Sequence, residues 1–176
     1  MDSNSQVLTS VRFLQAGYCT QSGRLAGSSE RGRIRFYAVF LCIEHPVHGL
    51  SLIDTGYSPL FFEATQRFPG RLYRCLTPVH LSEHHDARGC LLAAGIDPDA
   101  VRRIFVTHYH ADHVAGLHCF PQAEFICRHE PLLSLQQQST LQQVRHGFLK
   151  DLLPTDFAER ATMLADQQFV SGTGLL

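Results

Sequence analysis

The strongest constraint on the fold is a run of ten residues, 34–43 (IRFYAVFLCI), that is mostly apolar and rich in strand-forming side chains. Such a run is typical of a buried β-strand. The turn sequence HPVHG follows it, and a second apolar stretch at residues 50–53 leads the chain back beside the first strand. This hairpin ends at Asp54-Thr55-Gly56. We therefore expect a β-sheet at the centre of the fold.

Further strands and helices are predicted on both sides of this hairpin. Ser82 can cap a helix that Gly95 closes, and the glutamine-rich piece QQQSTLQQ is expected to form a solvated helix face. The order of these elements predicts an α/β fold with helices packed on a mixed sheet. The other expected elements are strands at residues 7–18, 104–107 and 123–127, a surface loop at 21–32, a helix at 60–68 and mainly helical structure after 130.

The composition excludes several classes of protein. The chain has 176 residues, of which 44% are hydrophobic, and this size suits one globular domain. Its net charge of -1 leaves no basic surplus for binding nucleic acid. No run approaches the roughly 18 apolar residues of a membrane span. The start MDSNSQVLTS lacks the pattern of a secretory signal, so we expect a cytoplasmic protein. Its six cysteines are expected to be small, mostly buried hydrophobes rather than disulfides.

The segment that carries chemistry follows one of the expected buried strands. Residues 107–113 read THYHADH and hold three histidines and one aspartate. Residues two apart in an extended chain project to the same side, so His108 and His110 can present two imidazoles to one ion. Asp112 and His113 can then face a second point nearby. Imidazole and carboxylate ligands suit Zn²⁺, and also Mn²⁺, Fe²⁺ or Co²⁺, so the sequence predicts a metal site here.

The longer segment THYHADHVAGL resembles the metal-binding motif of the metallo-β-lactamase-fold hydrolases. LIDTG, at residues 52–56, resembles a strand-end motif of the same superfamily, and the N-acyl homoserine lactonases are the most similar members. The resemblance covers roughly residues 7–130. It implies an αββα sandwich, of which this chain holds mainly the N-terminal half as a mixed sheet with flanking helices. Residues 1–176 would then form a single domain that is incomplete at its C-terminus.

The resemblance also implies roles for individual residues. His108 and His110 would bind the first of two divalent metal ions, and Asp112 and His113 the second, with zinc favoured over manganese, iron or cobalt. Asp54 would steady the ligand loop from behind. The two ions would lower the pKa of a shared water, and the hydroxide would attack an ester, lactone or thioester carbonyl of a small-molecule substrate. Asp112 is the implied catalytic residue, because it would orient the hydroxide and pass a proton to the leaving group.

The sequence departs from the family after this motif. The second half of the family's fold supplies a third histidine, a bridging aspartate and a last histidine. Only His118, His129 and His146 follow the motif here, none in the glycine-rich context of the family, and His146 is expected on the surface. We interpret the final FVSGTGLL as an interrupted stretch of sequence rather than as a natural C-terminus. The consequence would be an open metal site and a sheet face without its partner sheet, which predicts association, such as a homodimer through that face.

Other functions stay open at this point. The chain could be a truncated, weakly active or inactive half-domain that acts as a binding or association module. Within the superfamily, a glyoxalase-II-like thioesterase, a nuclease and a persulfide dioxygenase share the motif. Metal content and turnover distinguish these alternatives.

Overall fold

The structure is a computed structural model and describes residues 10–24, 27, 29 and 32–165. Within these residues the strands form one seven-stranded sheet in the order β4-β1-β2-β3-β5-β6-β7. This arrangement confirms the predicted α/β fold with a mixed sheet. The strands are β1 (Ser10–Ser22), β2 (Arg33–His45), β3 (Gly49–Ile53), β4 (Val79–His80), β5 (Val101–Val106), β6 (Glu124–Arg128) and β7 (Ala161–Leu164).

Short helices fill the connections between the strands. In the part of the chain that is described, no helix has the length and the apolar character needed to cross a membrane. The α-helices are α1 (Leu60–Ala64), α2 (Gly70–Leu76), α3 (Ala87–Ala93), α4 (Ala111–Val114), α5 (His129–Gln136), α6 (Thr140–Arg145) and α7 (Phe157–Arg160). The 3₁₀ turns are η1 (Pro98–Ala100), η2 (Leu117–Cys119) and η3 (Lys150–Leu152).

The sheet combines two kinds of strand pairing. Strands β1, β2 and β3 are antiparallel neighbours, whereas β3, β5, β6 and β7 run parallel. Ile53 at the end of β3 pairs with Phe105 near the end of β5. The carboxyl ends of these two strands therefore meet at one edge of the sheet, where α/β folds usually hold their ligands.

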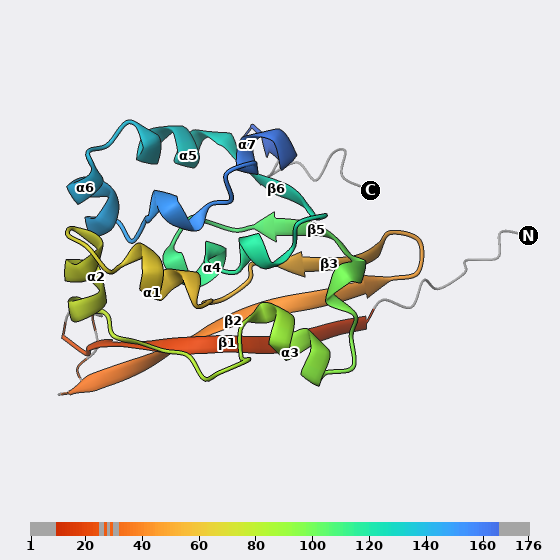
Figure 1. The fold of residues 1–176 in the computed structure, drawn as a ribbon, viewed down its shortest axis with the longest axis horizontal. Helices are drawn as coiled ribbons and strands as arrows, with labels where there is room; N and C mark the ends of the chain where they lie inside the picture. The colour runs from red at the N-terminus through yellow and green to blue at the C-terminus, as the bar shows by residue number, and fades with distance from the viewer. Residues whose placement is uncertain (1–9, 25–26, 28, 30–31, 166–176) are drawn as a thin grey trace, which may run out of the picture.

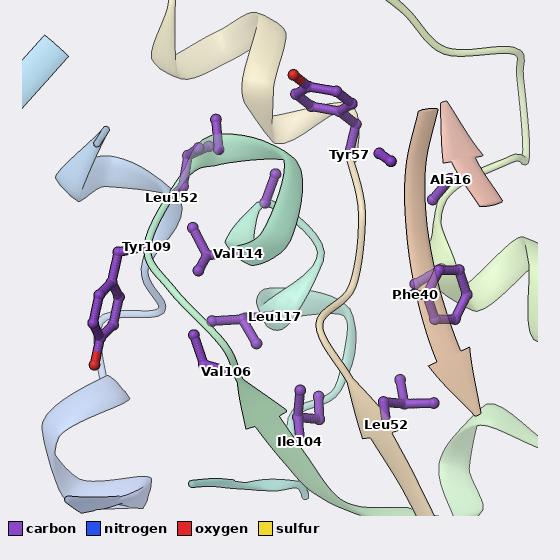
Figure 2. Packing of buried hydrophobic residues seen from close by; sticks show 14 of the residues in the cluster. Ala16, Phe40, Leu52, Tyr57, Ile104, Val106, Tyr109, Val114, Leu117 and Leu152 are labelled. Atoms are coloured by element: carbon purple, nitrogen blue, oxygen red, sulfur yellow. The ribbon is translucent and has the colours of Figure 1, made fainter. Parts of the chain in front are cut away.

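The helices cover one face of the sheet. Along β2, Ala38, Phe40 and Cys42 are buried, while the alternate residues Tyr37 and Val39 are exposed, as expected for a strand with only one covered face. Figure 1 shows α3 beside β1, and α4 contacts β2. The core fills the covered side (Figure 2). Its labelled side chains include Leu52 from β3, Ile104 and Val106 from β5, Val114 from α4 and Leu117 from η2.

The other face of β1 and β2 carries an apolar patch, which we define as Val11, Phe13, Val39, Leu41 and Ile43. Val11 is paired with Ile43 and Phe13 with Leu41, so these side chains lie on the same face of the sheet. Phe13 is 74% exposed. The patch is therefore a surface of strand side chains that the described residues leave open.

The differences from the sequence prediction concern helices, chain ends and two strands that were not expected, β4 and β7. The helix expected to start at Ser82 begins instead at Ala87, because the Asp86 side chain accepts a hydrogen bond from Gly89 N and so caps it. The stretch 71–81, in which no periodicity is visible, contains most of α2 and all of β4. The predicted start of the first strand at residues 7–9 and the final FVSGTGLL lie outside the described residues.

Candidate metal centre

The ligand motif, residues 107–113, lies at the carboxyl end of β5. The chain leaves β5 after Val106 and enters the short helix α4 at Ala111. The ring centroid of His108 is 4.6 Å from that of His110 and 3.8 Å from that of His113. Asp112 Oδ2 lies 3.4 Å from His113 Nε2. The structure thus brings the four predicted ligands together.

Asp54 is the buried anchor of this motif. It follows β3 in the left-handed backbone region, with φ of 60°, and is 5% exposed. Its Oδ1 accepts a hydrogen bond from Thr107 N at 2.9 Å, and its Oδ2 accepts from Thr107 Oγ1 at 2.7 Å and from His113 Nδ1 at 2.8 Å. The Thr107 hydroxyl oxygen also lies 3.0 Å from His108 Nδ1 and can accept a hydrogen bond from it. Asp54 therefore orients two of the three histidines.

The residues after Asp54 fix the helix that carries the ligands. Thr55 N and Thr55 Oγ1 both donate to the carbonyl oxygen of His113, at 3.0 and 2.8 Å. The Thr55 hydroxyl in turn accepts from Gly116 N at 3.1 Å. A Cβ atom at Gly116 would lie 2.9 Å from the Thr55 carbonyl oxygen, so only glycine allows this approach. The strand end and α4 are therefore held as one unit.

The protonation of the site follows from these contacts. Burial lowers the pKa of His108, and the neighbouring His113 and His110 lower it further, so His108 tends to be neutral. Burial acts in the same direction on His113, but its hydrogen bonds with Asp112 and Asp54 outweigh burial and raise its pKa to about 9. Burial would raise the pKa of Asp112, but the hydrogen bond with His113 lowers it overall. Asp112 is therefore a carboxylate at neutral pH.

The donor set fits a divalent metal ion by its chemistry. Among the described residues, no three histidine, cysteine or carboxylate side chains already surround a common point as they would around an ion. However, His108 and His113 each use Nδ1 in a hydrogen bond, which leaves Nε2 as the ligand atom. A carboxylate behind the imidazole is the usual arrangement of metal-binding histidines. Asp112 and His113 would have to separate slightly to admit the ion between them.

A cavity of about 790 Å³ opens beside this centre, with His110 and Asp112 in its wall. Four exposed apolar side chains from three elements line this cavity: Phe36 of β2, Leu72 and Leu76 of α2, and Leu141 of α6. This volume is in the range of small-molecule sites. The cavity therefore joins an apolar surface to His110 and Asp112.

Sequence reasoning missed several parts of this site. The role of Thr107 and the apolar lining of the cavity were not predicted, although Leu72 and Leu76 stand at the helical i, i+4 spacing that could have indicated an apolar stripe. His146 is exposed, as predicted, but it also lines the cavity, and its Nδ1 lies 2.7 Å from Gln138 Oε1. Tyr109, between the ligands, is buried and donates to the Arg128 carbonyl, so it packs beneath the loop.

Comparisons with known proteins agree with this fold. Among solved structures, a mutant of AiiA from B. thuringiensis, with N-decanoyl-L-homoserine bound at its active site, has a TM-score of 0.71 and 17% identity, over 90% of this chain and 60% of that chain. A probable metal-dependent hydrolase from Staphylococcus aureus has a TM-score of 0.66 and 16% identity, over 89% of this chain and 59% of that chain. AidC, a dizinc quorum-quenching lactonase, has a TM-score of 0.60 and 14% identity, over 89% of this chain and 58% of that chain.

These structures share the fold of this chain, which spans about 60% of the length of the AiiA mutant. A family model described as the metallo-beta-lactamase superfamily matches residues 43–134, just over half of the chain, and this range includes the whole ligand motif. The chain belongs to the metallo-beta-lactamase superfamily.

Proposed function

We propose that this chain forms the N-terminal part of a metal-dependent hydrolase that cleaves an ester, lactone or thioester. One observation carries the proposal: three histidines and a carboxylate meet at the carboxyl end of β5, with His113 Nδ1 held by the buried Asp54. A site with this donor chemistry beside a cavity is typical of hydrolytic metal centres. The similarity in fold to the AiiA mutant, which has N-decanoyl-L-homoserine bound at its active site, and to AidC, a dizinc lactonase, supports the same class.

In this proposal His108 and His110 hold a first divalent ion, and Asp112 and His113 hold a second. Zinc is the favoured metal, with manganese, iron and cobalt as alternatives. Such ions, when bound, lower the pKa of water towards neutrality and polarise a carbonyl oxygen. Asp54 keeps the Nδ1 atom of His113 protonated, so Nε2 would be the ligand atom, and binding of an ion would release the proton that Nε2 directs at Asp112.

Asp112 is the proposed acid–base residue. Because it is ionised at neutral pH, its carboxylate can accept a hydrogen bond from the attacking water and align it with the carbonyl carbon. The same carboxylate can then hold the proton and deliver it to the leaving oxygen or sulfur. No serine or cysteine nucleophile is required for this reaction.

The cavity defines the proposed substrate class. Phe36, Leu72, Leu76 and Leu141 offer an apolar wall, while His110 and Asp112 lie in the wall of the same cavity. A small molecule with an apolar substituent attached to its ester, lactone or thioester carbonyl would bury that substituent against the apolar wall. This arrangement would place the carbonyl next to the ligands.

Metal analysis of the purified 176-residue chain tests the proposal. We expect bound zinc by plasma mass spectrometry, and we expect His110→Ala to lose most of it while the circular dichroism spectrum stays the same. His48→Ala is the matched control, because His48 lies in the turn between β2 and β3, at the other end of β3. Hydrolysis of acyl lactones and thioesters by the zinc-loaded chain would then support the reaction.

Two results would contradict the proposal. Metal content in His110→Ala equal to that of the parent chain would show that the ligand assignment is wrong. A parent chain that binds no metal would favour the alternative of an inactive half-domain that acts by association.

A further inference from the structure

His110 differs from the other two histidines of the site in how its ring is held. His108 Nδ1 is hydrogen-bonded to the Thr107 hydroxyl, and His113 Nδ1 to Asp54. Within the described residues, no hydrogen bond holds the His110 ring. What lies against this ring is the backbone of a distant turn, at Gly147: a Cβ atom built on Gly147 would be 2.9 Å from His110 Cδ2 and 3.3 Å from His110 Nε2.

Gly147 is fixed in this place by the end of helix α6. It has φ of 73°, and Gly147 N and Phe148 N donate to the carbonyl oxygens of Val144 and Gln143, which is the Schellman pattern of a helix end. Val144 and Phe148 are buried in the core, so the turn cannot move away easily. The local structure alone would explain a glycine here, because glycine adopts positive φ without cost.

The contact with His110 is a second and separate reason why position 147 requires glycine. The carbonyl oxygen of Gly147 accepts a hydrogen bond from Ala111 N at 3.1 Å, so the same residue also holds the peptide that follows His110. Any side chain at position 147 would occupy the space of the imidazole. Because a histidine ring can rotate away, such a side chain would cost the fold little but would displace the ligand.

We propose that Gly147 is a positioning residue for His110: by lacking a side chain, it lets the imidazole rest on the turn after α6 in the orientation that metal binding needs. The proposal depends on the metal site described under the proposed function. It extends the site to a residue more than thirty positions beyond the ligand motif.

Gly95 provides a matched control. It follows α3 with φ of 74°, and Gly95 N and Ile96 N donate to the Leu92 and Leu91 carbonyls, so it occupies the same position of the same kind of helix end. A Cβ atom on Gly95 would meet nothing within 4 Å. Alanine at either position therefore has the same backbone strain, but only the change at 147 reaches a ligand.

The experiment is a Co²⁺ titration of the metal-free 176-residue chain, followed by the visible absorption of the bound ion. We expect Gly147→Ala to bind Co²⁺ about 10–100-fold more weakly than the parent, with an altered spectrum, as for other losses of ligand support. Gly95→Ala should match the parent in both. Both alanine variants should lower Tm to a similar extent.

An asparagine at position 147 separates the need for a positive φ from the need for space beside His110, since asparagine tolerates positive φ but carries a Cβ atom. Gly147→Asn should recover most of the Tm lost in Gly147→Ala and still bind Co²⁺ weakly. Parental Co²⁺ affinity and spectrum in Gly147→Asn would overturn the positioning role while leaving the metal site intact. A parent chain that binds no Co²⁺ would overturn the proposed function, and this inference with it.

Discussion

At the scale of single residues, Asp54 holds the segments of the candidate site together. One carboxylate joins the end of β3 to the end of β5 through Thr107, and to α4 through His113. Its 5% exposure means that water cannot replace these hydrogen bonds. The same carboxylate acts on His108 through the Thr107 hydroxyl. The stability of the fold and the proposed metal site therefore depend on the same side chain.

Replacing this carboxylate should weaken both properties. Asp54→Asn keeps the size of the side chain and tolerates the φ of 60°, but it loses the negative charge and an acceptor oxygen. We expect Zn²⁺ affinity to fall about 10–100-fold and the free energy of unfolding to fall by about 1–3 kcal/mol. Calorimetric titration and urea denaturation of the metal-free chain measure these quantities. Asp99→Asn, at an exposed ion pair with Arg88, should change neither, and equal effects of both variants would contradict the role of Asp54.

Thiol labelling gives a prediction that does not involve metal. Burial, together with the nearby Asp86 carboxylate, raises the pKa of Cys119 to about 12, so only about one thiol in 10⁴ is ionised at pH 8. Cys75 is exposed on α2. Iodoacetamide should therefore modify Cys75 within minutes and Cys119 only after unfolding in urea, as measured by peptide mass spectrometry. Rapid labelling of Cys119 in the folded chain would show that its surroundings differ from those described.

At the scale of elements, the sequence was most informative for strands. The run at residues 34–43 indicated β2 because its strand-forming side chains are confined to one short apolar segment. Helix α2 was missed because its exposed leucines, Leu72 and Leu76, form a single i, i+4 pair, which is too short a pattern to identify a helix from the sequence. The glutamine-rich piece was predicted only in part: Gln143 is buried, and its amide donates to the carbonyls of Leu135 and Gln138, so it joins α6 to the end of α5.

The site shows the same limit of prediction. The motif indicated His108, His110, Asp112 and His113 because all the chemistry stands within seven residues. Gly147 could not be identified as part of the site, since nothing in a helix-ending glycine shows which distant side chain rests on it. Contacts between segments far apart in sequence depend on the packing of the whole chain.

The start of α3 can be tested directly. Asp86 accepts a hydrogen bond from Gly89 N at 2.8 Å, so Asp86→Ala should lower the free energy of unfolding by about 1 kcal/mol. Ser82 was expected as the cap from the sequence, but it lies outside the helix, and Ser82→Ala should leave stability unchanged. Urea denaturation of both variants measures the difference. A larger loss in Ser82→Ala would restore the helix start predicted from the sequence.

At the scale of the whole molecule, one face of the sheet packs against the helices and the other face is open to association. The covered face holds the core, whereas the apolar patch on β1 and β2 has no cover among the described residues. Its five side chains are all uncharged, so an identical patch on a second copy is a compatible partner. Association through this patch would bury side chains that are exposed to water in the single chain.

We therefore expect the chain to self-associate through the patch. The double variant Phe13→Lys with Val39→Lys should shift the species seen by light scattering after size exclusion towards the monomer. Phe68→Lys with Val47→Lys makes the same change in composition and charge at exposed positions outside the patch. A parent chain that is monomeric at every concentration, or the same shift in both variants, would contradict this expectation.

The two kinds of strand pairing also determine when the site can assemble. Strands β1, β2 and β3 pair with their neighbours in sequence, but the hydrogen bond between Asp54 and His113 closes a separation of 59 residues. Contacts that close long loops form late, because the chain loses conformational entropy on closing the loop before the contact contributes favourable interaction energy. During synthesis the hairpin would be complete before the ligand motif leaves the ribosome. Metal would then bind after most of the fold has formed, and it would stabilise the folded state. The supply of metal in the cell would therefore affect how long the folded protein persists rather than whether folding begins.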